Sequence, residues 1–266
     1  MRMVRAFILT LCILPKRVNK PLPLMCLGTE VILQGRYIEK AELVRYFKKE
    51  STFLLNMIKF FSDITSDDMS LVGGKNLKLG EMYNLCSKNA HDLKVPNGFA
   101  LTTLAYEKLI LTENGGTLKN SLSTILTDVD VSNADAVEVA SQKCKNLIIE
   151  IGFHLPWLKT EITNAYATLC SLSSTGGSPN MSLAVRSSAT AEDLPDCSFA
   201  GQHDSYLNIY GANQLFIATL NVIASLFNAR AIVYRVENGF DHFRVLISVG
   251  FMKMIRSDLS SSGIAF

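Results

Sequence analysis

The sequence lacks the cysteine and histidine patterns that mark a metal site or a disulfide framework. Its six cysteines are scattered without any C-x-x-C pair, and its four histidines show no spacing typical of metal ligands. We therefore expect no metal site built from this chain. Such cysteine usage is explained more simply by reduced thiols and a cytoplasmic location than by a disulfide framework.

The sequence also lacks an excess of charge of one sign and a long apolar run. Lys and Arg number 26 against 24 Asp and Glu, a net charge of +2, so we expect neither nucleic acid nor a membrane as a partner. The apolar run at residues 6–14 is shorter than the roughly 20 residues that span a bilayer. Pro15, Lys16 and Arg17 follow it where a signal peptide carries small residues, so no working signal is expected.

What remains is the composition of a folded protein: 266 residues, 48% hydrophobic and 19% charged. Residues 1–56 show no sustained helical or strand period until about Glu39, and we interpret them as an N-terminal extension of uncertain order. Residues 57–266 are expected to form one domain, incomplete at its C-terminal end, because the chain stops inside an expected strand that begins at Gly263.

Short strand patterns and amphipathic helix patterns follow one another along this domain, which predicts an α+β fold. The expected strands are residues 57–61, 99–101, 183–185 and 205–209, with a hairpin formed by 245–249 and 251–255 and broken near Gly250. The expected helices are residues 76–87, 102–111, 137–151, 156–169, 213–227 and 231–236.

A glycine turn precedes the first of these helices. Gly73 and Gly74 let the backbone approach an anion closely, the helix N-terminus directs N–H groups at it, and Lys75 adds an ammonium group. The spacing is not that of a G-x-x-x-x-G-K-[ST] P-loop. Taken alone, the tripeptide is more often a plain turn than a phosphate site.

A second unusual segment covers residues 185–195. Arg186 stands at the end of an expected strand and is able to grip a phosphate with two hydrogen bonds. An ion pair between Arg186 and Glu192 or Asp193, with nearby hydroxyls capping a turn, is an equally weighted alternative.

Several longer sequence words, in this order, connect the two segments. They are VGGKN and LGEM (72–76 and 79–82), VPNGFA (95–100), VRSSATAEDLPDCSFAGQ (185–202), ASLFNARAIVYRVENGFDH (224–242) and RSDLSSSG (256–263). Over residues 71–266 the chain resembles the N-terminal nucleotide-binding region of the phosphoenolpyruvate synthase (pyruvate, water dikinase) family, one of the phosphoenolpyruvate-utilising enzymes. Many words in one order are far more specific than any single word.

The resemblance implies an ATP-grasp-type fold of the pyruvate phosphate dikinase N-terminal kind. In the complete enzyme it implies conversion of ATP, pyruvate and water to AMP, phosphoenolpyruvate and phosphate, with Mg²⁺, through a phosphohistidine, and a homodimer is expected. Lys75 and Arg186 would hold the ATP phosphates and take part in phosphoryl transfer. Gly201 and Ser205 would line the nucleotide.

The chain departs from the family pattern in one strand residue. Met252 stands where the family has a glutamine near the adenine, and a thioether replaces neither the donor nor the acceptor of an amide, so we expect weaker or altered base recognition.

Other parts implied by the resemblance lie beyond Phe266, namely the Mg²⁺-binding carboxylates, the domain with the phosphorylated histidine and the pyruvate-binding barrel. His203 and His242 are interpreted as structural hydrogen-bonding residues. Arg230 and Arg235 are expected on the exposed face of a helix.

Two alternatives stay open at this point. Rifampicin phosphotransferase, pyruvate, phosphate dikinase and glucan, water dikinase share the nucleotide-binding domain, and the phosphoryl acceptor is chosen elsewhere in each enzyme. The chain is also interpretable as a nucleotide-binding fragment that transfers nothing by itself.

Overall fold

The computed structural model describes residues 57–88, 93–112, 117–127, 129–172, 181–190 and 203–263, together with the backbone of 26–27 and 30–31. The chain divides into two compact units, residues 1–49 and 50–266. In the first unit, β1 (Cys26–Leu27) pairs antiparallel with β2 (Glu30–Val31). All other elements belong to the second unit, on which the remaining description rests.

The second unit is built on one five-stranded sheet of antiparallel pairs. Its strands lie in the order β3-β4-β7-β5-β6. Their bounds are β3 (Ile58–Phe60), β4 (Gly98–Leu101), β5 (Ser182–Ala189), β6 (Ser205–Tyr210) and β7 (Ile247–Lys253). Because β7 lies between β4 and β5, the C-terminal part of the chain closes the centre of the sheet.

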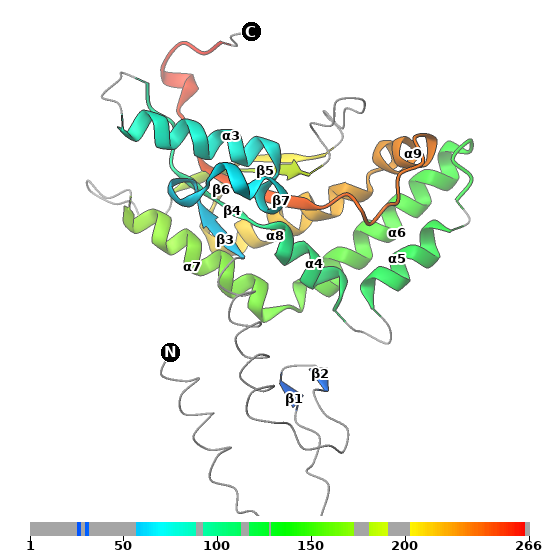
Figure 1. Ribbon diagram of the computed structural model, residues 1–266. Coiled ribbons are helices and arrows are strands. Elements are labelled where there is room, and N and C mark those ends of the chain that lie inside the picture. The colour runs from blue at the N-terminus through cyan, green and yellow to red at the C-terminus, as the bar shows by residue number, and fades with distance from the viewer. Residues whose placement is uncertain are drawn as a thin grey trace, which may run out of the picture. The chain divides into compact units, whose positions relative to one another are not determined.

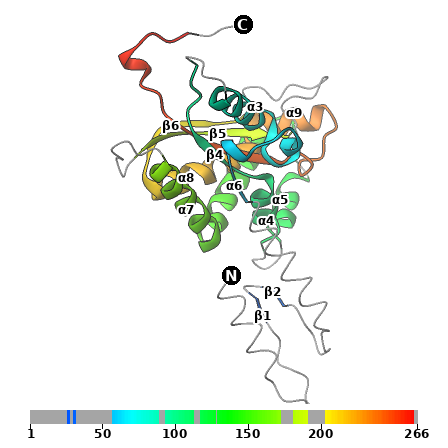
Figure 2. The same cartoon turned by 60° about the vertical axis from the view of Figure 1, so that its left-hand side comes forward.

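Helices cover both faces of this sheet (Figures 1 and 2). One face is packed against α3 (Met69–Lys88), and the opposite face against α4 (Thr103–Ile110), α7 (Pro156–Leu172) and α8 (Gly211–Ala224). Helix α6 (Ala134–Phe153) packs against α8 and its 3₁₀ extension η3 (Ser225–Phe227). Helix α5 (Leu118–Leu126) packs on α6 and α4, and α9 (Ala229–Glu237) packs on α6 and η3. Short 3₁₀ turns also occupy Phe61–Asp63, Ser66–Asp68 and Ser257–Leu259.

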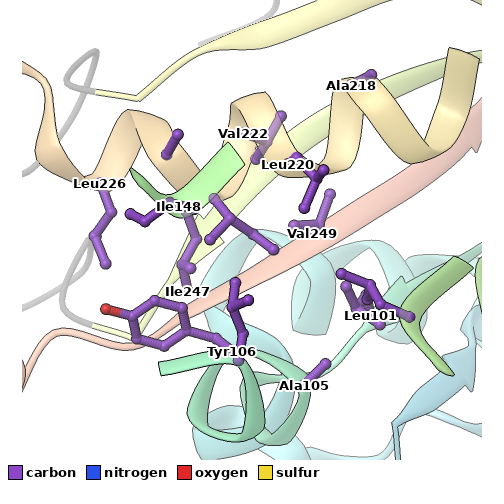
Figure 3. Close-up of a cluster of buried hydrophobic side chains, with 14 of the residues drawn as sticks. Leu101, Ala105, Tyr106, Ile148, Ala218, Leu220, Val222, Leu226, Ile247 and Val249 are labelled. Carbon is purple, nitrogen blue, oxygen red and sulfur yellow. The ribbon is translucent and has the colours of Figure 1, made fainter. Parts of the chain in front are cut away.

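The main hydrophobic core lies between the sheet and the helices opposite α3. Figure 3 shows Tyr106 of α4, Ile148 of α6 and Leu226 of η3 converging on the β7 side chains Ile247 and Val249. All five side chains are buried. A smaller cluster under α3 joins Phe61, Ile64, Val72, Leu77 and Ala100. The strands β4 and β7 are therefore largely buried on both faces, which their nearly continuous apolar sequences reflect.

In the part of the chain that the structure describes, one helical stretch is long and apolar enough to cross a membrane by length and composition. It covers Gly211–Glu237, has a mean hydropathy of 1.6, and is 67% buried inside the protein. The stretch is interrupted by η3 and Asn228, and its α8 part packs against β5, β6 and β7. Core packing accounts for this apolarity.

The sequence predicted most of these elements. The α+β fold is confirmed, and the helices around residues 137–151, 156–169 and 213–227 are present with shifted ends. The hairpin expected at 245–255 is wrong, because β7 runs unbroken through Gly250. A Cβ at Gly250 would lie 2.2 Å from the Asn76 Oδ1 atom, so this glycine serves close packing and not a turn. Helix α5 was missed, and the strand expected from Gly263 falls largely on residues outside the described part.

Candidate functional site

The helix α3 is broken at Gly73, where the sequence predicted a glycine turn. Gly73 has φ 70° and ψ 167°, so two helical segments meet at one non-helical residue. A Cβ at this position would lie 2.5 Å from the Ser188 carbonyl oxygen and 2.6 Å from its Oγ atom. Only glycine combines a positive φ with this close approach to β5. The second helical segment therefore starts directly against the sheet.

A buried polar network fixes that helix start to three strands. The Asn76 backbone N–H donates to Ser188 Oγ at 3.2 Å, and Asn76 Nδ2 donates to Ser248 Oγ at 3.1 Å. Ser248 Oγ in turn donates to the Leu101 carbonyl oxygen at 2.8 Å. Because buried polar groups are expensive to leave unpaired, this network sets where α3 lies on the sheet. Sequence reasoning quoted Asn76 only as part of the VGGKN word and missed its anchoring role.

Strand register places Arg186, Ser205 and Met252 on the face that α3 covers. Ser188 and Ser248, which contact Asn76, are a cross-strand pair of β5 and β7. Side chains alternate along a strand, so Arg186 and Met252 share the face of these serines. Ser205 of β6 lies directly opposite Arg186 and therefore faces the same way.

Lys75 precedes Asn76 on α3 and is exposed, as are Arg186 and Ser205. The structure thus brings two cationic side chains and a hydroxyl to one side of the sheet, beside a helix N-terminus, which is a favourable arrangement for an anion. Arg186 does not end its strand as expected, because β5 continues to Ala189. The longer strand is stabilised by its pairing with β7 along its whole length.

Met252 is half-buried at the edge of this face. It packs against the small cluster under α3, next to the partly buried Leu71, Leu79 and Tyr83. Its thioether therefore contributes apolar contact area, and a role in base recognition stays a prediction.

Gly201, Glu192 and Asp193 lie outside the described residues. The expectation that Gly201 lines a nucleotide and the alternative ion pair of Arg186 with Glu192 or Asp193 both stay predictions.

His203 and His242 are hydrogen-bonded inside the protein, as the sequence predicted. His203 Nδ1 lies 3.3 Å from the Ser225 carbonyl oxygen, and His242 Nδ1 accepts from Arg235 Nε at 3.0 Å. Burial, together with the positive charge of Arg235, lowers the pKa of each histidine to about 4. Both imidazoles are therefore neutral at physiological pH.

Arg235 is the clearest error of the sequence analysis. It was expected on an exposed helix face, but its relative exposure is 0%. Its helix α9 contacts α6 and η3, and periodicity alone did not reveal that the arginine faces inward. Arg230 does lie on an exposed face, where its side chain is 59% exposed and approaches Asp204 at 3.8 Å.

The described residues contain no group of three or more histidine, cysteine or acidic side chains able to hold a metal ion. We therefore assign no metal ligand to this part of the chain. Within the described residues, Cys86, Cys144 and Cys170 form no disulfide bond.

Comparisons with known proteins point to one family. Residues 69–266 match the family described as pyruvate phosphate dikinase, AMP/ATP-binding domain. The chain is 43% identical over 212 residues to a phosphoenolpyruvate synthase of Helicobacter pylori, and 40% identical over 210 residues to that of Escherichia coli, alignments that cover 80% and 79% of the chain. It is 38% identical over 213 residues, 80% of the chain, to a probable phosphoenolpyruvate synthase of Methanocaldococcus jannaschii.

The chain spans only part of the length of these relatives. The matched region is 25% of the Helicobacter pylori and Escherichia coli proteins and 17% of the Methanocaldococcus jannaschii protein. The matched residues include α3, the whole sheet except β3, and the face that carries Lys75, Arg186, Ser205 and Met252. The chain belongs to the pyruvate phosphate dikinase AMP/ATP-binding domain family.

Proposed function

We propose that this chain binds ATP on the α3 face of its sheet, as the nucleotide-binding part of a phosphoenolpyruvate synthase. The observation that carries the proposal is the common face of Arg186 and Ser205, next to the helix start that carries Lys75. Membership of an AMP/ATP-binding domain family supports the same ligand.

In this proposal Lys75 and Arg186 bind the phosphate chain and offset the charge that develops during phosphoryl transfer. Phosphoryl transfer depends mainly on positioning and electrostatic stabilisation, so exposed cations on a rigid sheet and helix are suitable groups. The fixed break at Gly73 and the Asn76 network make the backbone at Lys75 rigid before ligand binds. Ser205 contributes a hydroxyl to the same ligand, and Gly201 allows the backbone to approach that ligand closely.

The complete reaction is a proposal for a longer protein. A phosphoenolpyruvate synthase would convert ATP, pyruvate and water to AMP, phosphoenolpyruvate and phosphate through a phosphohistidine. Mg²⁺ would accompany ATP and offset phosphate charge, but the described residues offer no carboxylate cluster for it, so its protein ligands are proposed to lie elsewhere. Neither of the two buried histidines is proposed as a phosphoryl carrier.

Further aspects of the proposal rest on the family and on composition. We place the protein in the cytoplasm, where the thiols of Cys86, Cys144 and Cys170, which form no disulfide among the described residues, would stay reduced. Pyruvate binding and a homodimer are proposed for the complete enzyme only.

Calorimetric titration of the chain with Mg-ATP tests the binding site. Replacement of one charged contact removes about 1.5–3 kcal/mol of binding free energy, so Lys75→Met and Arg186→Met should each raise the Kd by about 10- to 150-fold. Lys78→Met is the matched control, because Lys78 lies on the same helix, its side chain is 72% exposed, and it pairs only with Glu81 among the described residues. The control should keep the Kd of the unsubstituted chain.

Two outcomes would contradict the proposal. A folded chain that binds no ATP would exclude the site altogether. Equal losses for Lys75→Met and Lys78→Met would show that the charge of α3, and not a specific phosphate contact, governs binding.

A further inference from the structure

Arg235 is a buried cation without a carboxylate partner among the described residues. Its side chain is fully buried, and its guanidinium carbon lies 5.5 Å from the centre of the Phe227 ring. Its Nε atom donates to His242 Nδ1, while neither terminal nitrogen has a hydrogen-bond partner within the part of the chain that the structure describes. Burial lowers the pKa of Arg235 to about 10, so it still carries its charge at neutral pH.

Among the described residues, the titratable groups around Arg235 do not neutralise that charge. His242 accepts from Arg235 through its unprotonated Nδ1 and is thus neutral, and His203 is neutral because burial lowers its pKa to about 4. Burial raises the pKa of Tyr106, and raises the pKa of Cys144 to about 12, so the phenol and the thiol keep their protons. A hydrophobic side chain of similar volume would avoid this desolvation cost. Stability alone therefore gives no reason for an arginine at this position.

A short chain of contacts connects Arg235 to the proposed nucleotide site. Phe227, which lies under the guanidinium, belongs to the same 3₁₀ turn as Ser225. Ser225 holds the start of β6, because its carbonyl accepts from His203 and its Oγ accepts from the Asp204 N–H at 3.1 Å. The next residue, Ser205, lies opposite Arg186.

The His203 imidazole is influenced by the charges of both Arg235 and Lys75. It lies within electrostatic range of these two cations, which lower its pKa from two different elements, α9 and α3. In the poorly polarisable interior, the field of an unneutralised charge extends farther than in water. The field of Arg235 therefore reaches the region of the phosphate-binding cations.

We propose that Arg235 is a positioning residue that acts on the nucleotide site through its charge, and strengthens binding in proportion to the negative charge of the ligand without touching it. This inference rests on the proposed ATP site. Its ligand class is a nucleoside polyphosphate, and its effect is a preference for ATP over ADP, AMP and adenosine.

A ligand series of decreasing charge tests the proposal. Arg235→Gln removes the charge and keeps a donor for His242. At an effective dielectric constant of about 20, a unit charge changes the binding affinity roughly tenfold for each ligand charge that lies about 10 Å from it. We expect the variant to lose about tenfold or more in ATP affinity, less for ADP and AMP, and nothing for adenosine. Lys159→Met is the control, since Lys159 is an exposed residue of α7 on the opposite side of the sheet.

A purely structural role predicts a different pattern. Equal losses for ATP and adenosine in Arg235→Gln, or the charge-graded loss in Lys159→Met as well, would overturn the role of Arg235 and leave the ATP site intact. An unsubstituted chain that binds neither ligand would overturn the ATP site and this role together.

A second variant applies if Arg235→Gln is not folded by circular dichroism. Arg235→Lys keeps a positive charge, but apolar surroundings lower the pKa of a buried ammonium group, which then loses its proton as the pH rises. The ratio of ATP affinity to adenosine affinity should therefore fall between pH 6 and pH 9 by about tenfold more in this variant than in the unsubstituted chain. An identical ratio profile in both proteins would overturn the proposal.

Discussion

Asn76 and Ser188 are 112 positions apart, yet the backbone N–H of Asn76 donates to the Ser188 hydroxyl at 3.2 Å. This bond joins the start of the second segment of α3 to the central part of the sheet, two residues from Arg186 on the same strand face. It explains how Lys75 and Arg186 come to lie on one side of the molecule.

Asn76→Ala should destabilise the protein by about 1–3 kcal/mol. The substitution leaves the buried Ser248 hydroxyl without the Asn76 amide and opens space above Gly250. Urea unfolding followed by circular dichroism measures the change. Asn146→Ala, at an exposed position of α6, is the control and should change the unfolding free energy by less than about 0.5 kcal/mol. Similar values for both variants would show that the network adds little.

Gly73→Ala should be far more damaging than Gly239→Ala, although both glycines have a positive φ, 70° and 67°. A Cβ at Gly73 meets Ser188 backbone and side-chain atoms, whereas a Cβ at Gly239 meets nothing within 4 Å. We expect a cost of about 1 kcal/mol at Gly239 from backbone strain alone, and several kcal/mol at Gly73.

The two glycine variants also separate stability from binding. Gly73→Ala should weaken ATP binding, because α3 must shift away from β5, and Gly239→Ala should not. Unfolding midpoints and ATP titrations on both proteins give the measurement. Equal losses of unfolding free energy in the two variants would mean that the structure around Ser188 accommodates the added Cβ without destabilising the protein.

Stability should fall as the pH drops from about 6.5 towards 4, in part because of His203. Its pKa is lowered to about 4 in the folded protein, against about 6.5 in the unfolded chain, so the unfolded state binds protons first. Between pH 7 and pH 5 this difference costs about 2 kcal/mol of unfolding free energy.

The variant His203→Gln should remove that part of the acid sensitivity. Urea unfolding at pH 7 and pH 5 should show a stability loss about 2 kcal/mol smaller in the variant than in the unsubstituted chain. An unchanged loss would mean that His203 is not held neutral by its buried position.

Met252→Gln should increase discrimination of adenine from other bases, if the residue faces the base as the resemblance implies. An amide offers a paired donor and acceptor, which a thioether lacks. The ratio of ATP to GTP affinity should rise by about 5- to 30-fold, the value of one hydrogen bond of about 1–2 kcal/mol. A ratio unchanged by this substitution and by Met252→Ala would exclude Met252 from base recognition. The half-buried packing of Met252 makes a parallel stability measurement necessary.

Much of the fold was predictable because its signals are local. The apolar period of α6 and α7, the Asn133 cap that accepts from the Ala136 N–H, and the proline that opens α7 are all written in neighbouring residues. The Gly-Gly-Lys turn was predictable for the same reason, since only glycine tolerates the backbone angle of Gly73.

The errors arose where a residue serves a distant partner. Gly250 was interpreted as a break in a hairpin, but it is the place where the Asn76 side chain approaches β7. Arg235 was interpreted as a surface residue, but its helix packs into the core beside Phe227 and His242. Neither partner lies in the sequence window from which a periodicity is read.

Residue types and their order were thus enough to indicate the family and the α+β class, because these depend on short words and local periods, whereas the roles of Lys75 and Arg186 stay predictions. The strand order β3-β4-β7-β5-β6, the shared face of Arg186 and Ser205, and the buried charge of Arg235 came from long-range pairing. Burial and register are properties of contacts between segments far apart in the chain, and a linear pattern does not encode which segments meet.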